Sequence, residues 1–332
     1  MHIPVLMREA VEWLVIRPEG VYVDATVGAG GHSRAILENL TTGRLVALDK
    51  DPWAIEIAQE NLQTYLQKLT LVQRDFGDIL PLLRELQLNA VDGILADLGL
   101  SQMQIDRPER GFSLNAAGPL DMRINPSQRL TAADIVNHFD EHQLADLIYQ
   151  YGEERRSHRI ARAIVRARPI RNTVQLADVI EACLGGRRGS SRRKPGLGGP
   201  RGVAFRTIRK RIHPATRTFQ ALRIVVNQEL DSLARLLKDA PACLAPQGRL
   251  VIISFHSLED RLVKQHFQRW DRNGLMRNLT PHVIRPGVSE IQANPRSRSA
   301  RLRAAERLAQ RPQKENKENP EAEIALRQSQ SS

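Results

Sequence analysis

The sequence predicts an α/β fold: a mostly parallel sheet with helices on both faces, into which an all-helical region is inserted. Four apolar, β-branched runs alternate with helical stretches between residues 21 and 98, and each run ends in a polar residue. A fifth apolar run, GRLVIISF, follows a long helical region. Strands that alternate with helices pair in parallel, and ligands bind at the carboxyl ends of such strands. We therefore expect a ligand site where these runs end.

The expected elements follow in chain order. Strands are expected at 21–26, 44–49, 69–75, 91–98 and 248–255. Helices of the α/β part are expected at 33–40, 52–68, 79–88 and 216–237. The second of these opens with Pro52, whose missing N–H is harmless at a helix start. Helices of the insertion are expected at 131–139, 141–151, 153–168 and 172–184.

Composition suggests the domain boundaries. We expect residues 1–105 and 214–307 to form the α/β domain and residues 106–213 to form the helical insertion. Residues 185–202 are rich in Gly, Ser and Arg, which predicts a basic flexible loop. Residues 308–332 are polar and lack aromatic side chains, which predicts a disordered tail.

Positive charge is concentrated in one segment. The net charge is +12, yet residues 155–217 hold eighteen Lys and Arg against two acids, so the remainder is slightly acidic. A localised basic segment favours RNA or DNA as the partner over an anionic membrane, and over a charge run that only aids solubility. No apolar run approaches the roughly 20 residues of a membrane helix, and the N-terminus has no signal-peptide core. We expect a cytoplasmic protein that has no membrane partner.

The cysteines predict neither a disulfide nor a metal site. Cys183 and Cys243 are far apart, and neither has a second Cys or a His at ligand spacing. The oligomeric state, monomer or homodimer, stays open.

A glycine-rich turn, DATVGAGGHS, joins the first strand to a helix at residues 24–33. Glycines let the backbone turn sharply, and the helix N-terminus offers free N–H groups to a carboxylate or phosphate. The GxGG spacing, in place of GxGxxG, weakens the dinucleotide interpretation. A dinucleotide, S-adenosylmethionine (SAM) or a simple tight turn all remain open for this segment alone.

Acidic residues follow the second and third strands. Asp49 stands about 20 residues after the glycine turn, where an acid can accept both hydroxyls of a ribose. Asp51 directly precedes Pro52 and is the better helix N-cap, which leaves Asp49 for the ligand. Asp75 and Phe76 suit adenine binding and a structural role equally well.

Asp97 opens the DLGLS segment at the end of the fourth strand. Methyltransferases that act on amines place the polar group that holds the target amine at this position. A carboxylate that accepts the N–H bonds of an exocyclic amine favours a nucleophilic nitrogen, which must lie in line with the transferred methyl group. Methylation at cytosine C5 would need a cysteine nucleophile, and neither cysteine stands at a strand end. The residues therefore favour transfer to an amine.

Two further segments, HPATRTFQALR at 213–223 and SFHSLEDR at 254–261, mix His, Ser or Thr, and Arg at element boundaries. Such side chains suit contacts with RNA phosphates or bases. We expect His256 and Ser257 to act with Asp97 in holding the amine and base. Residues expected to contact RNA are Arg206, Arg209, His213 and Arg217.

The chain resembles the ribosomal RNA small subunit methyltransferase H family (RsmH/MraW) from residue 2 to about 307. The matching stretches are HIPVL, GAGGHS, ALDKDPWAI, DLGLS, ERGFS, PLDMR, HPATRTFQALRI, FHSLEDRLVK and NPRSRSARLR. The resemblance implies a Rossmann-like, SAM-dependent domain with an inserted helical substrate domain. It also implies N4-methylation of one cytidine in the decoding region of 16S rRNA, in the small ribosomal subunit.

The resemblance also assigns roles to residues. Gly30, Gly31 and His32 would contact SAM, and Asp49 would hold its ribose. Phe76 would lie by the adenine, while Asp97 and Gln104 would complete the cofactor site; for Gln104 the resemblance is the only argument.

The sequence departs from the family pattern in two places. The family reads DLGxSSxQ where this chain has DLGLSQMQ, and the Arg/Gly-rich loop is longer.

The sequence disfavours three alternative functions. An NAD-dependent oxidoreductase is disfavoured by the missing GxGxxG, and a DNA amino-methyltransferase by the missing Pro-Pro-aromatic motif. A non-catalytic RNA-binding assembly factor with a vestigial SAM pocket is disfavoured by the intact acidic residues.

Overall fold

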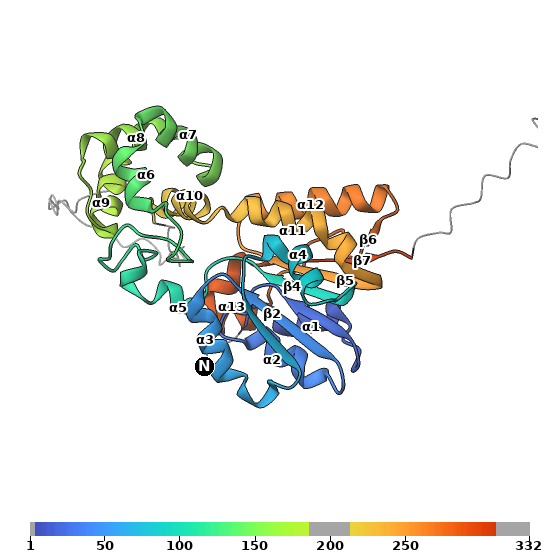
Figure 1. The fold of residues 1–332 in the computed structure, drawn as a ribbon. Helices are drawn as coiled ribbons and strands as arrows, with labels where there is room; N and C mark the ends of the chain where they lie inside the picture. Colours follow the sequence, from blue (N-terminus) through green and yellow to red (C-terminus); the bar gives the residue numbers. More distant parts are fainter. Residues whose placement is uncertain (1–3, 186–212, 310–332) are drawn as a thin grey trace, which may run out of the picture.

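The computed structural model describes residues 4–185 and 213–309, which form a seven-stranded sheet flanked by helices and a helical lobe beside it (Figure 1). The strand order is β3-β2-β1-β4-β5-β7-β6, with β1 to β5 parallel and with β7 antiparallel to both of its neighbours. The strands are β1 Val21–Asp24, β2 Arg44–Asp49, β3 Leu69–Gln73, β4 Val91–Asp97, β5 Leu244–Ser254, β6 Met276–Asn278 and β7 Arg301–Arg307. This arrangement confirms the predicted fold class.

Helices cover both faces of the sheet. The helices outside the lobe are α1 Met7–Leu14, α2 Gly31–Asn39, α3 Pro52–Asn61, α4 Ile79–Glu85, α5 Gln102–Ile105, α11 Glu229–Cys243, α12 Ser257–Arg272 and α13 Val288–Ala293. Short 3-10 turns lie at Gln63–Tyr65, Phe76–Asp78, Pro108–Arg110 and Pro295–Ser299. Apolar side chains of α4, α11 and α12 form the core on one face, and those of α1, α2 and α3 form the core on the other. The central parallel strands β1, β2 and β4 are mostly apolar because both of their faces are largely buried.

The helical lobe has a core of its own. It contains α6 Ala132–His138, α7 Glu141–Gly152, α8 Ser157–Arg166, α9 Thr173–Cys183 and α10 Thr216–Asn227. Buried side chains of α7, α8, α9 and α10 pack together, among them Ile148, Ile164, Ile180 and Leu222. The lobe is therefore an inserted helical unit, as expected.

The single helix expected at 216–237 is wrong. The chain breaks at Gln228, which adopts a left-handed conformation (φ 52°) between α10 and α11. The apolar side of α10, including Phe219, packs in the helical lobe, whereas Leu236 of α11 packs against the sheet. Since α10 shares the lobe's core, we place the domain boundary at Gln228 and not at 213/214.

The two antiparallel strands, β6 and β7, were not expected. β7 carries two charged residues in its buried interior, and this hid its strand character. One of them, Arg303, is buried because its guanidinium donates to Asp260 Oδ1 at 2.7 Å. A pattern of alternating polar and apolar residues could not reveal such a strand.

No helix in the described part of the chain is long and apolar enough to cross a membrane. The expected basic loop at 185–202, apart from residue 185, and the expected tail from residue 310 onward lie outside the described residues.

Candidate cofactor and substrate site

Asp24, the last residue of β1, anchors the glycine turn at its start. Its carboxylate is fully buried and accepts from Ser33 Oγ at 2.6 Å and from the backbone N–H of Thr26 at 3.1 Å. Burial raises the pKa of Asp24 to about 6. Because Thr26 and Ser33 lie at the two ends of the turn, Asp24 fixes both ends of the loop.

The glycine turn brings bare backbone to the carboxyl edge of the sheet. Gly28 and Gly30 have left-handed φ values of 51° and 86°, which only glycine adopts readily. A side chain at Gly31, the first residue of α2, would collide with Pro4 at 2.3 Å. The space beside Gly28, by contrast, is open to 4 Å. A ligand can therefore approach the backbone at Gly28.

Asp49 ends β2 next to this turn. Its Oδ2 accepts from the N–H of Gly28 at 3.1 Å, and its Oδ1 accepts from the N–H of Asp51 at 2.9 Å. Burial raises the pKa of Asp49 to about 6. Two carboxylate oxygens offer about four acceptor positions, so two remain for the hydroxyls of a ribose. Asp51 caps α3 as expected, accepting from the N–H of Trp53 at 3.2 Å.

Asp75 has structural partners on both oxygens. It caps the turn at Phe76–Asp78 by accepting from Gly77 N–H at 2.8 Å, and it accepts from Ser232 Oγ at 2.8 Å. Lys50 Nζ lies 3.6 Å away as an ion partner. Phe76 is half-buried against the sheet core and keeps an exposed part. The contacts of Asp75 therefore favour its structural role over adenine binding. Adenine contact stays a proposal for Phe76.

Asp97 ends β4 on the other side of the glycine turn. Its N–H donates to Thr26 Oγ1 at 2.7 Å, and its Oδ2 lies 3.6 Å from His32 Nδ1. Its Oδ1 is buried and has no hydrogen-bond partner among residues 4–185 and 213–309. Burial raises the pKa of Asp97 well above its usual range, and the carboxyls of Asp24 and Glu259 add to the effect. The side chain as a whole is half-buried, and a carboxyl with one unpartnered oxygen can accept from a substrate amine.

The imidazole of His32 lies beside Asp97. The ring is buried, and its Nε2 lies 3.1 Å from the carbonyl of Val5. Because a carbonyl only accepts, Nε2 carries the proton and Nδ1 faces Asp97. The ring therefore packs beside the carboxyl, with Nδ1 3.6 Å from Asp97 Oδ2, and a direct cofactor contact from His32 would come from its backbone N–H at the start of α2.

Gln104 lies on α5, which follows the β4 end. It forms a capping box with Ser101, and its Nε2 donates to Asp51 Oδ2 at 2.8 Å. Arg110 reaches the same carboxylate, with Nη2 3.2 Å from Oδ2, and its guanidinium lies 4.4 Å from the centre of the Trp53 ring. Gln104 thus lies beside the edge of the sheet that carries Asp49 and Asp97, which we call the cofactor edge. Asp51, which the sequence predicts only as a helix cap, is buried there and binds both Gln104 and Arg110.

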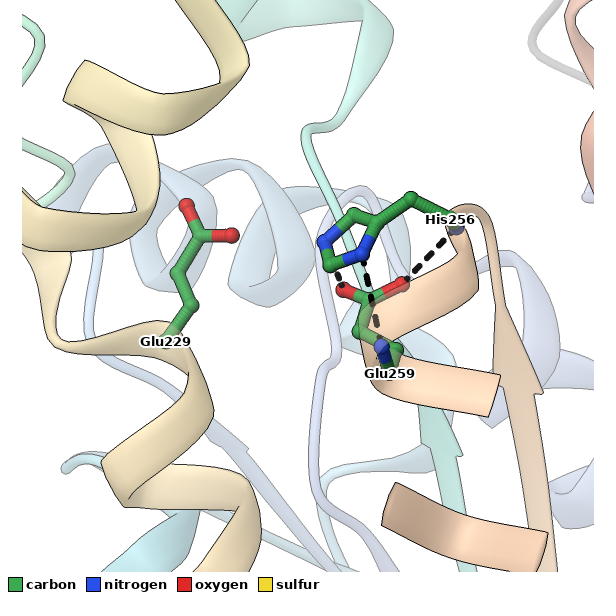
Figure 2. A group of neighbouring side chains, drawn as sticks. All are labelled: Glu229, His256 and Glu259. Carbon is green, nitrogen blue, oxygen red and sulfur yellow. Dashed lines mark hydrogen bonds and ion pairs between the residues drawn. The ribbon is translucent and has the colours of Figure 1, made fainter. Parts of the chain in front are cut away.

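His256 caps α12 and lies between two glutamates (Figure 2). Its Nδ1 accepts from Glu259 N–H at 3.3 Å, and its Nε2 lies 3.1 Å from Glu259 Oε1. Glu229 of α11 points toward the ring, but Arg223 donates to both of its oxygens at 2.8 Å. Burial alone would raise the pKa of Glu259; His256 and Arg223 outweigh this effect, and the pKa lies below its usual value.

These three side chains could be taken for a metal site, since their ligand atoms lie within 4.8 Å of one another. The hydrogen bonds argue otherwise. Because Nδ1 of His256 accepts a backbone N–H, the ring proton of the neutral side chain is on Nε2, the atom that a metal would need. Glu229 is already neutralised by Arg223. We assign no metal to this cluster.

Ser257 is engaged with the helical lobe. Its hydroxyl donates to Glu153 Oε2, and Arg261 Nη2 donates to the other oxygen of Glu153 at 2.7 Å. Arg217 of α10 donates to the carbonyl of Glu153 at 3.2 Å. Ser257 and Arg217, placed in the base and RNA sites from sequence, therefore meet at the contact between the lobe and α12.

The remaining RNA candidates are more remote. His213 is half-buried, with Nε2 3.9 Å from Glu181 and with Nδ1 accepting from Ala215 N–H at 3.2 Å. Arg206 and Arg209 lie outside the described residues.

Residues 1–308 match the MraW methylase family. The chain belongs to the MraW methylase family. The ribosomal RNA small subunit methyltransferase H of Solibacter usitatus is 48% identical over 306 residues, covering 92% of this chain and 99% of the relative. The proteins of that name from Dehalococcoides mccartyi and Trichodesmium erythraeum are each 46% identical, covering 92% and 93% of this chain and 86% and 99% of the relatives.

Members of the MraW family are SAM-dependent methyltransferases, which confirms the predicted family, enzyme class and cofactor class. Membership also excludes the NAD-dependent oxidoreductase. The MraW fold of this chain brings the glycine turn, Asp49, Asp97 and Gln104 to one edge of the sheet. It directs Ser257 and Arg217 toward the lobe contact instead.

Sequence reasoning missed Asp24 and Arg110 as members of this site. A signal existed for each: Asp24 opens the glycine turn, and Arg110 stands in the ERGFS stretch that resembles the family. Neither signal told which carboxylate or guanidinium would be buried.

Proposed function

We propose that this protein transfers a methyl group from SAM to the N4 amine of one cytidine in the 16S rRNA of the small ribosomal subunit. The observation that carries the proposal is Asp97: a half-buried carboxyl, at the end of a parallel strand, with one oxygen that lacks a partner among the described residues. The name borne by the relatives, ribosomal RNA small subunit methyltransferase H, supports rRNA as the substrate. The N4 atom and the cytidine come from the family resemblance.

The residues at this edge suit SAM. Asp49 has acceptor positions left for ribose hydroxyls, and the open space beside Gly28 admits a ligand against the backbone. Thr26 binds Asp97 and Gly28 binds Asp49, so the turn lies between the two acids. When bound, SAM supplies an activated methyl group on a sulfonium.

Asp97 would act on the amine. Its free Oδ1 accepts an N–H bond of the amine and so holds the nitrogen lone pair toward the methyl group. The nitrogen gains positive charge on methylation and must then lose a proton. The raised pKa of Asp97 suits it to receive that proton.

The cysteines support transfer to nitrogen over transfer to carbon. Cys243 is buried in the sheet core, where burial raises the pKa of its thiol to about 12. Cys183 is on α9 in the helical lobe, and burial raises its thiol pKa too. A thiol with a raised pKa is a poor nucleophile, so C5 chemistry has no good candidate among the described residues.

The experiment combines purified protein, labelled SAM and small ribosomal subunits from cells that lack the modification. Digested RNA is then analysed for modified nucleosides. N4-methylcytidine, absent with Asp97→Asn, is the expected result. Label in 5-methylcytidine would overturn the N4 assignment. Intact SAM binding without any transfer, to subunits or to free rRNA, would favour the non-catalytic RNA-binding factor.

A further inference from the structure

Arg110 is a buried cation that contacts two different parts of the molecule. Its side chain is 6% exposed, and Nη1 and Nη2 lie 3.4 and 3.2 Å from the two oxygens of Asp51. The same guanidinium donates to the carbonyls of Arg123 and Ile124 at 3.0 and 2.8 Å. One side chain therefore ties the start of α3 to the loop that leads into the helical lobe.

The Asp51 end of this network reaches the cofactor edge. The N–H of Asp51 donates to Asp49 Oδ1, the carboxylate that we assign to the ribose. Gln104 binds the Asp51 side chain from α5. Any shift of Asp51 therefore moves an N–H that orients Asp49.

The other end of this network, at Arg123 and Ile124, reaches the break at Gln228 between α10 and α11. Ile124 N–H donates to Asn227 Oδ1 at 2.7 Å, and Asn227 Nδ2 donates to the carbonyl of Met122 at 2.7 Å. Asn227 is 1% exposed and is the last residue of α10, directly before the break at Gln228. Its own carbonyl accepts from Lys50 Nζ at 2.8 Å, and Lys50 follows Asp49 in the chain. The hydrogen bonds thus run from Asp49 to the break at Gln228, and the Lys50 contact leads back to the neighbour of Asp49.

We propose that Arg110 and Asn227 are positioning residues that couple SAM binding to the placement of the helical lobe, so that cofactor and RNA bind cooperatively. A buried ion pair has few alternative arrangements, since separating Arg110 from Asp51 would leave a buried charge without a partner. The cofactor edge and the loop must therefore move together. Coupling of this kind is reciprocal: SAM would raise RNA affinity by the factor by which RNA raises SAM affinity. The proposal rests on the proposed function, because it takes RNA as the ligand of the lobe.

The test measures two dissociation constants with the full-length protein. The first is for S-adenosylhomocysteine, by calorimetry. The second is for unmethylated small ribosomal subunits, with and without saturating S-adenosylhomocysteine. The coupling factor is the dissociation constant for subunits without S-adenosylhomocysteine divided by the constant with it. We expect it to be about tenfold in the wild type, within the usual range of about 5 to 150.

Two variants probe the two ends of the network. Arg110→Lys keeps a positive charge to pair with Asp51 but loses the guanidinium donors that reach the two carbonyls. Asn227→Asp keeps the acceptor for Ile124 and loses the donor to Met122. We expect both to lower the coupling factor to below about twofold. Arg107→Lys is the matched control, because Arg107 lies over the same Trp53 ring at 5.1 Å but is more exposed; it should keep the wild-type factor.

The outcomes separate the two proposals. Wild-type protein that does not bind S-adenosylhomocysteine would overturn both. Normal methyl transfer with a coupling factor of one would overturn the coupling alone. A wild-type factor in Arg110→Lys, with thermal unfolding confirming a folded protein, would show that the residue is merely structural. Asn227→Asp leaves the contacts of Asp49 with Gly28 and Asp51 in place. Lost coupling with unchanged S-adenosylhomocysteine affinity in this variant therefore cannot be explained by damage to Asp49.

Discussion

The cofactor edge and the outer face of α8 hold charge in opposite ways. Asp24, Asp49 and Asp97 are enclosed at the strand ends, and burial raises the pKa of each carboxyl. On α8, Arg159 and Arg166 are exposed, while Ile160 and Ile164 on the other side of the helix are buried in the lobe core. Buried charges have fixed partners and exposed charges are screened by water and salt. Substitutions at the edge should therefore have large, specific effects, and those on α8 should have graded, salt-dependent effects.

The largest effect is expected at Asp97. Asp97→Asn keeps the shape but replaces one oxygen with a donor, so the amine loses its acceptor. We expect kcat to fall by about 10³-fold, as for other groups that stabilise a transition state electrostatically. Single-turnover transfer to unmethylated subunits measures it. Asp106→Asn is the control, because the Asp106 side chain is 57% exposed beside Arg296. Activity within threefold of wild type in Asp97→Asn would rule out the proposed role.

Asp49→Asn should separate binding from stability. We expect SAM affinity to fall by about 10²-fold, because an amide replaces an acceptor for two ribose hydroxyls. Stability should change in the opposite direction. The pKa of Asp49 is raised from 3.8 to about 6, so its stabilising contribution is present below pH 3.8 and is lost as pH rises through 6. The variant should therefore gain about 2 kcal/mol relative to wild type at pH 8 compared with pH 4. Unfolding in urea at both pH values tests this, and a larger gain at pH 4 would contradict it.

The same carboxyl should make cofactor binding depend on pH. The ribose hydroxyls need the ionised form of Asp49, whose pKa is about 6. SAM affinity should therefore be constant above pH 7 and weaken by up to about tenfold per pH unit below 6. Calorimetry from pH 5 to pH 8 measures the profile. Asp49→Asn should flatten it; an unchanged slope in that variant would assign the titration to another group.

The arginines of α8 should act through charge alone. Arg159→Gln with Arg166→Gln should weaken subunit binding by about fivefold at physiological salt. If each arginine meets one phosphate, the slope of log affinity against log salt should fall by about two. Affinity for S-adenosylhomocysteine should not change. Arg269→Gln with Arg272→Gln removes the same charge from the last turn of α12 and serves as the control. An equal loss in both pairs would mean that net charge, and not this face, binds RNA.

The smallest effect is expected at Ser257. Its hydroxyl is one of several partners of Glu153, and Arg261 and Arg217 remain when it is removed. Ser257→Ala should change kcat by less than about threefold and lower the free energy of unfolding by about 1 kcal/mol. Steady-state kinetics and urea unfolding test both. A loss of 100-fold or more in kcat would restore Ser257 to the base-binding site predicted from the sequence.

The elements that the sequence predicts well are those with local signals. The strand ends at Asp49 and Asp97 follow from apolar runs, and Asp51 as a helix cap follows from its place before Pro52. The glycine turn is likewise predictable from its own residues, because the left-handed backbone at Gly28 and Gly30 favours glycine. Local geometry is enough in these cases, since the partners are a few residues apart.

Tertiary structure decided everything that depends on distant partners. The break at Gln228 exists because α10 and α11 pack in different cores, which no helical periodicity could reveal. Asp51 meets Arg110 across 59 residues, and Ser257 meets Glu153 across 104. By itself, the sequence determined which side chains end the strands and so which chemistry is available. The packing of the lobe against the sheet decided which of those groups are buried, paired or free, because burial and pairing are properties of the fold.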